Sequence, residues 1–118
     1  MGKLSRVLRS VETVSGSGIG FWCPGCSKMH VVSVSGPHAW SWDGNVMAPT
    51  LSPSILVTGI ERITDDEHAR IMAGEKIKPR PLRCHSFLRG GVIDYLGDCS
   101  HALAGQKVPL PDLPDERP

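Results

Sequence analysis

The stretch FWCPGCSKMH, residues 21–30, holds two cysteines three positions apart, with Pro-Gly between them and a histidine four residues after the second. A tight turn through Pro24 and Gly25 directs both sulfurs toward one point, as in a zinc knuckle. The segment MHVVSVSG that follows is typical of a strand, whereas the CxxC of a thioredoxin-like protein opens a helix. The stretch therefore predicts half of a metal site at the end of a β-strand. A redox pair and reduced core thiols are the weaker alternatives.

The other two cysteines complete a predicted tetrahedral shell of Cys23, Cys26, Cys84 and Cys99, which uses all four cysteines of the chain. Four thiolates are a common ligand set for structural Zn²⁺. Each of three histidines lies close in sequence to a cysteine and is an alternate ligand: His30, His85 and His101. The alternative is that each of the three is a surface or hydrogen-bonded histidine without a metal.

Length and composition indicate a single globular domain in which long helices are scarce and turns are common. The chain has 118 residues, 13 glycines and 10 prolines, and a formal charge of +1. This balance exerts no strong global attraction on nucleic acid or anionic membranes. No apolar run is long enough to span a bilayer, and the N-terminus lacks the apolar core of a signal peptide. We therefore expect a cytoplasmic protein without membrane contact, in which thiols stay reduced and favour metal over disulfides.

The expected fold class is mainly β, a small zinc-stapled β-sandwich or open barrel built from hairpins, with one short inserted α-helix. Residues 4–14 read as a strand followed by a turn at SGSGIG. Because Pro53 cannot donate to a ladder, the strand in TLSPSILVTGI is expected to span residues 54–60. Thr64 and Glu67 form a capping box, which predicts the helix over residues 65–73.

The segment LRCHSFLRGGVIDYLGDCSH predicts a β-hairpin that turns at residues 90–91. Strand alternation places Cys84 on one face and His85 on the other. We expect residues 1–108 to form one zinc-stabilised domain. The proline-rich, charged residues 109–118 are expected to be an extended or disordered tail.

Several uncommon motifs occur in an order that resembles a family of small phage- and prophage-encoded proteins. They are CPGC (23–26), His30, Trp42, PTLSPSI (49–55), CHSF (84–87), GGVIDYL (90–96) and DCSHALAGQKVPLP (98–111). The resemblance covers roughly residues 19–111 and implies a bacterial host cell and a zinc-stapled, strand-rich fold. Automatic labels such as "ammonia monooxygenase" accompany this family, but membrane-bound copper chemistry does not suit a chain without a spanning segment. Related sequences keep a histidine matching His85 while the nearby cysteine shifts, so the resemblance leaves either Cys84 or His85 as third ligand.

The sequence favours a non-catalytic phage accessory module that uses structural zinc and binds a host or phage protein, for counter-defence, or a small ligand. The alternative is a zinc-dependent hydrolase in which Asp98, His101 and His85 surround a metal with an open position. A third possibility is nucleic-acid binding through the basic run Lys76–Arg89. Trp40 and Trp42 are large for a small domain to bury, which is compatible with a homodimer, although ordinary core packing is the preferred interpretation.

Overall fold

The computed structural model describes residues 3–14, 16–61 and 63–114, and its two antiparallel sheets confirm the mainly β prediction. The first sheet has the order β1-β2-β3 and the second the order β4-β5-β6-β7-β8. The strands are β1 (Arg9–Thr13), β2 (Gly16–Cys23), β3 (Lys28–Ser33), β4 (Ser41–Trp42), β5 (Leu51–Ile60), β6 (Pro81–Arg89), β7 (Val92–Tyr95) and β8 (Lys107–Pro109).

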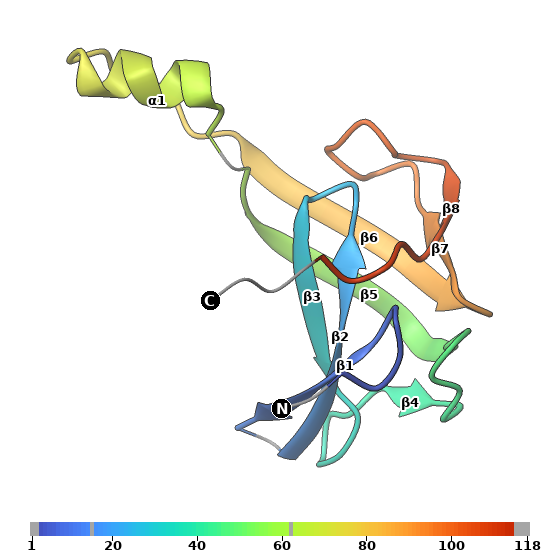
Figure 1. Cartoon of the computed structure of the whole chain (residues 1–118). Coiled ribbons are helices and arrows are strands. Elements are labelled where there is room, and N and C mark those ends of the chain that lie inside the picture. Colours follow the sequence, from blue (N-terminus) through green and yellow to red (C-terminus); the bar gives the residue numbers. More distant parts are fainter. Residues whose placement is uncertain (1–2, 15, 62, 115–118) are drawn as a thin grey trace.

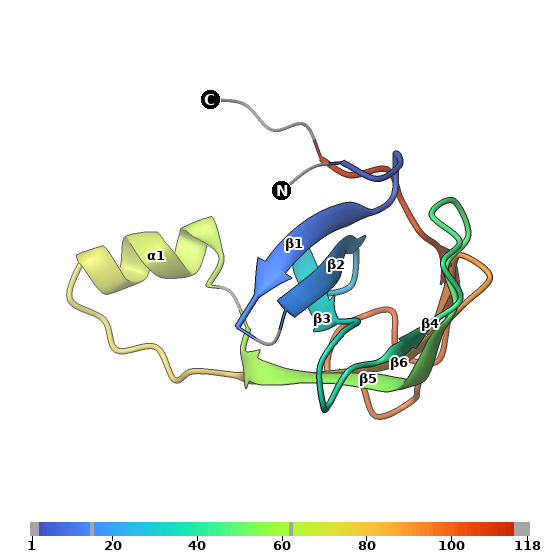
Figure 2. The same cartoon turned by 90° about the horizontal axis from the view of Figure 1, so that it is seen from below.

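The two sheets face each other and bury the core between them (Figure 2). β2 contributes Ile19 and Phe21, and β6 contributes Leu82 and Leu88, all nearly inaccessible to solvent. The alternation expected for β6 is confirmed, because every second residue from Leu82 to Leu88 is buried. Trp40 and Trp42 are partly buried against this core.

The turn predicted at SGSGIG is confined to the start of that segment. β1 and β2 pair antiparallel from Thr13 with Gly16, and Gly16–Cys23 form a strand between β1 and β3. Within the strand, Gly18 reflects close packing rather than a change of direction. A Cβ atom on Gly18 would lie 2.7 Å from the Thr13 side chain and 2.9 Å from the Val32 carbonyl oxygen. Alternation places Ile19, Phe21 and Cys23 on the buried face.

The start of β5 also differs from the prediction, since the strand begins at Leu51 rather than at residue 54. Its pairing with β6 shifts register between Leu51 and Ile55. Pro53 lies in this interruption, where a missing N–H removes no ladder hydrogen bond. The interruption allows the strand to continue through a proline.

The predicted helix is present as α1 (Asp65–Met72), with the capping box formed as expected. The Thr64 hydroxyl accepts from the Glu67 amide at 3.1 Å, and the Glu67 carboxylate accepts from the Thr64 amide at 2.9 Å. Figure 1 shows α1 projecting from the far end of β5 and β6, away from the two sheets. Among the described residues, no helix is long and apolar enough to cross a membrane.

The C-terminal segment beyond residue 108 is extended and packs onto the rest of the domain. β8 pairs with β7, and the Leu110 amide donates to the Gly91 carbonyl at 2.9 Å. The Leu113 amide donates to the Arg6 carbonyl at 2.7 Å, and the Leu113 side chain is buried. The tail predicted for residues 109–118 thus contains contacts up to residue 113, and residues 115–118 lie outside the described part of the chain.

Candidate functional site

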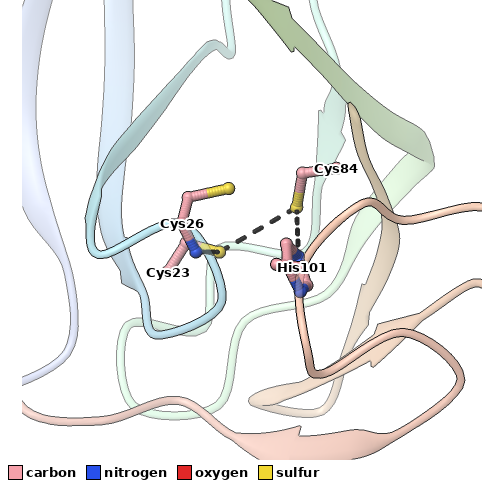
Figure 3. Close-up of side chains that lie close together, drawn as sticks. All are labelled: Cys23, Cys26, Cys84 and His101. Carbon is pink, nitrogen blue, oxygen red and sulfur yellow. Dashed lines mark hydrogen bonds between the residues drawn. The ribbon is translucent and has the colours of Figure 1, made fainter. Parts of the chain in front are cut away.

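Three cysteines and one histidine point toward a common centre between the two sheets (Figure 3). Cys23 is the last residue of β2, Cys26 lies in the turn that follows, Cys84 is in β6, and His101 is in the loop between β7 and β8. Their three sulfurs and one imidazole nitrogen all lie within 4.8 Å of one another. We call these four residues the Cys3His cluster, and it is able to hold a metal ion.

The spacing in the cluster fits a tetrahedral zinc site. Zn–S bonds of about 2.3 Å and Zn–N bonds of about 2.0 Å at tetrahedral angles separate sulfurs by about 3.8 Å and sulfur from nitrogen by about 3.5 Å. In the protein, the sulfurs of Cys23 and Cys84 are 3.9 Å apart. His101 Nε2 lies 3.3 Å from the Cys84 sulfur. Four protein ligands at this spacing are typical of a closed, structural site.

The charge of the cluster also favours a bound cation. The pKa of the Cys23 thiol is held well below its ordinary value, mainly by hydrogen bonds from Cys26 and Cys84. The hydrogen bond with Cys23 raises the pKa of Cys26 to about 11, and the hydrogen bonds with Cys23 and Cys26 raise the pKa of Cys84 well above its usual range. Crowding therefore favours ionisation of Cys23 and opposes ionisation of the other two thiols, and a divalent cation would allow all three to ionise.

Two neighbours hold the cluster in place. The Tyr95 hydroxyl lies 3.1 Å from the Cys23 sulfur and accepts from the Gly25 amide at 3.3 Å. The Tyr95 ring also packs edge-on against His101, with ring centroids 4.7 Å apart. Gly25 leaves room for that imidazole, because a Cβ atom there would lie 2.7 Å from His101 Nδ1.

The structure places Cys99, the predicted fourth ligand, outside the Cys3His cluster. Its sulfur donates to the His85 carbonyl at 3.2 Å and accepts from the His85 amide at 3.3 Å. His101, an alternate ligand in the sequence prediction, lies in the cluster instead. His30 is buried with its ring against Phe21, and it is not one of the four residues of the cluster.

His85 belongs to a second group of side chains, on the opposite face of β6. Its Nε2 atom lies 3.0 Å from the Ser54 hydroxyl oxygen, and its Nδ1 atom lies 3.2 Å from Asp98 Oδ2. A serine, a histidine and an aspartate in this order form the geometry of a nucleophile, its base and the group that orients the base. We call these three residues the Ser-His-Asp group.

The electrostatics of Asp98 suit this arrangement. Its Oδ2 atom accepts from Arg83 Nε at 2.8 Å, and this bond, followed by the one to His85, lowers the pKa of the carboxyl group below its ordinary value. A carboxylate at this position accepts the Nδ1 proton of His85, which leaves Nε2 as the acceptor for the Ser54 hydroxyl. His85 is thereby held in the tautomer that a general base requires.

The two groups share β6 and the loop that follows β7. Cys84 and His85 are consecutive and face opposite sides of the sheet, as strand alternation predicts. Asp98 and His101 lie three residues apart in one loop. The Cys3His cluster and the Ser-His-Asp group therefore lie on opposite faces of β6.

The sequence prediction placed Asp98, His85 and His101 around one metal, and the structure separates them. Asp98 and His85 are together, but His101 lies in the Cys3His cluster and the third partner is Ser54. Ser54 was missed because it is 31 residues from His85 in the chain. The PTLSPSI motif, which contains Ser54, was an available signal.

The basic run is largely engaged in contacts within the chain. Arg80 pairs with Glu61 and Glu67, and Arg83 pairs with Asp98. The Arg89 guanidinium lies 4.0 Å from the centroid of the Phe87 ring. Lys76 and Lys78 are exposed.

Comparison with known proteins gives one family match. The family model described as "Bacterial ubiquitination-like system serine protease (BubE)" matches residues 3–96. This range contains Ser54, His85 and the three cysteines of the cluster, while Asp98 and His101 follow it. No curated protein and no solved structure matches the chain. Because the match covers most of the 118 residues, the chain belongs to the BubE family of bacterial ubiquitination-like system serine proteases.

Proposed function

We propose that the protein is a serine protease of a bacterial ubiquitination-like system, with Ser54 as nucleophile, His85 as general base and Asp98 as the residue that orients His85. The observation that carries the proposal is the pair of contacts at His85, 3.0 Å to the Ser54 hydroxyl and 3.2 Å to Asp98. The family description names the same class of enzyme. The substrate is then a protein of that system, cleaved at an amide or ester bond.

The reaction follows from the positions of the three side chains. Ser54 Oγ attacks the carbonyl carbon of the scissile bond while its proton passes to His85 Nε2. The imidazolium then gives that proton to the leaving group as the acyl bond breaks, which leaves an ester on Ser54. A water molecule, deprotonated by His85, hydrolyses the ester and restores the hydroxyl group. Asp98 stabilises the positive imidazolium that forms in both halves of the reaction.

The Cys3His cluster has a structural role in this proposal, with zinc as the ion that its donors and spacing suit. The ion would cross-link the turn after β2 to β6 and to the loop that carries Asp98. The four ligands of such an ion would be Cys23, Cys26, Cys84 and His101, so the nucleophile is supplied by Ser54 rather than by a metal-bound water. The cluster thereby fixes the backbone on which His85 and Asp98 are held.

Labelling with a fluorophosphonate probe tests the proposal, because such probes react only with activated serine hydroxyls. We expect one label per chain, located at Ser54 by mass spectrometry, and no label after Ser54→Ala or His85→Ala. Ser52→Ala is the matched control, since Ser52 lies in the same strand without a bond to His85, and it should label normally. Absence of labelling in the folded wild-type protein would refute the proposed function.

Other expectations from the sequence stay predictions. They are a phage or prophage setting, a host or phage partner, a small-ligand role and a homodimer. The protease proposal takes precedence over the non-catalytic module because a module has no need of a serine, a histidine and an aspartate joined in series.

A further inference from the structure

We infer that the free edge of β5 next to Ser54 binds the substrate as an added β-strand, so that the enzyme acts on an extended polypeptide segment. This inference rests on the proposed function, since it concerns how the substrate reaches the Ser-His-Asp group. Strand addition supplies affinity through main-chain hydrogen bonds, and the neighbouring side chains and pockets supply specificity.

The direction of the backbone groups in β5 follows from two hydrogen bonds. The Glu61 amide donates to the Arg80 carbonyl at 2.8 Å, so the odd-numbered residues direct their backbone groups toward β6. Trp40 Nε1 donates to the Ser54 carbonyl at 3.3 Å from the other side. The amides and carbonyls of Leu56, Thr58 and Ile60 therefore point away from β6.

That edge has no strand beside it in the described part of the chain. β4 pairs with Leu51 and Ser52 only, and the sheet order places no other strand next to β5 on this side. Leu56 and Ile60 are 50% and 63% exposed. Protected edges usually carry a lysine, a proline or an inward-pointing charge, and residues 54–60 contain none of these. The edge is thus suited to pairing.

The edge also lies where a protease substrate must lie. It begins beside the nucleophile, where the Trp40 indole closes the edge at the Ser54 carbonyl. At its other end, Ile60 lines a pocket of about 380 Å³ that also borders Cys26 and His101 of the Cys3His cluster. Its wall mixes apolar side chains with charged ones, Ile63 and Leu82 with Lys28, Glu61 and Asp65. From Ser54 to this pocket is about 20 Å along a strand. A segment of about seven residues therefore fits between the pocket and the nucleophile.

The Thr58→Pro variant tests the edge with little disturbance to the fold. Proline removes the outward N–H of Thr58, and a proline is tolerated on an edge strand where the N–H faces solvent. Thr58→Val is the matched control, because it keeps that N–H. Linear random peptides displayed on phage would be selected on the Ser54→Ala protein, which binds without cleaving. We expect the selected peptides to bind about 10-fold more weakly to Thr58→Pro in the Ser54→Ala background and equally well to Thr58→Val.

Amide hydrogen exchange provides a second measurement that does not depend on the proline variant. Bound peptide should slow exchange at Leu56, Thr58 and Ile60 and leave Val57, which already faces β6, unchanged. Failure to select any peptide, or selected peptides that leave these amides unprotected, would overturn the inference. Fluorophosphonate labelling of Ser54 distinguishes this failure from that of the protease proposal, since the probe reacts without occupying the edge.

Discussion

Replacing Asp98 by asparagine separates a catalytic role of the Ser-His-Asp group from a merely structural one. The Asp98 carboxylate accepts the Nδ1 proton of His85 at 3.2 Å. An asparagine amide can instead donate to Nδ1, which moves the imidazole proton to Nε2. His85 then has no lone pair for the Ser54 hydroxyl and cannot act as the base.

The size of the effect follows from the exposure of the site. In the serine-protease template the same change, at a buried aspartate, lowers kcat by about 10⁴-fold. The Asp98 side chain is 40% exposed. In the variant, water can therefore partly replace the carboxylate as the acceptor of the Nδ1 proton of His85. We therefore expect a loss of about 10²- to 10³-fold. Folding should be almost unaffected, because the ion pair with Arg83 is exposed, and the melting temperature should fall by a few degrees at most.

The assay is the second-order rate constant for the reaction of Ser54 with a fluorophosphonate, measured with the thermal unfolding curve of each variant. Asp94→Asn is a matched control, since Asp94 is an acidic residue of the neighbouring strand β7 without a bond to His85. Asp94→Asn should react at the wild-type rate. The reasoning would be refuted if Asp98→Asn reacts within about threefold of wild type, because Asp98 would then contribute nothing to the tautomer or the basicity of His85.

Three further results are expected. His101→Ala should lower zinc affinity by more than about 100-fold while Cys99→Ala leaves zinc content unchanged by elemental analysis, and loss of zinc in Cys99→Ala would contradict the Cys3His assignment. Tyr95→Phe should weaken zinc binding about 10- to 100-fold in a chelator competition and destabilise the fold by about 1–3 kcal/mol. The reason is that the Cys23 sulfur and the Gly25 amide lose the hydroxyl group with which they interact. Unchanged zinc affinity and stability would argue against a role of Tyr95 at the cluster. Arg80 lowers the pKa of Glu67 to about 2 from an ordinary value near 4.5, so this contribution to stability is complete above about pH 4.5 and is lost as the pH falls toward 2. Glu67→Gln should flatten the dependence of thermal stability on pH in that window, and an unaltered slope would show that the pair does not contribute.

Local patterns in the sequence predicted the features that depend on neighbouring residues. The capping box at Thr64 and Glu67 predicted the start of α1, because both partners lie within one helical turn. Alternation in β6 predicted that Cys84 and His85 face opposite sides. The CPGC turn predicted two sulfurs directed at one point. The glycines of β2 extended the predicted turn too far into the strand, because a glycine needed for close packing and one needed for a turn look the same in sequence.

The tertiary structure decided which distant residues meet. Cys99 and His101 were both candidates from their position near the end of the β6–β7 hairpin, and the path of the loop after β7 places the imidazole, not the Cys99 thiol, in the cluster. Ser54 meets His85 because β5 pairs with β6 in a register that sequence alone does not specify. The residue types and their alternation were determined by the sequence itself. Their grouping depended on sheet register and loop path, which are fixed by packing of the whole chain.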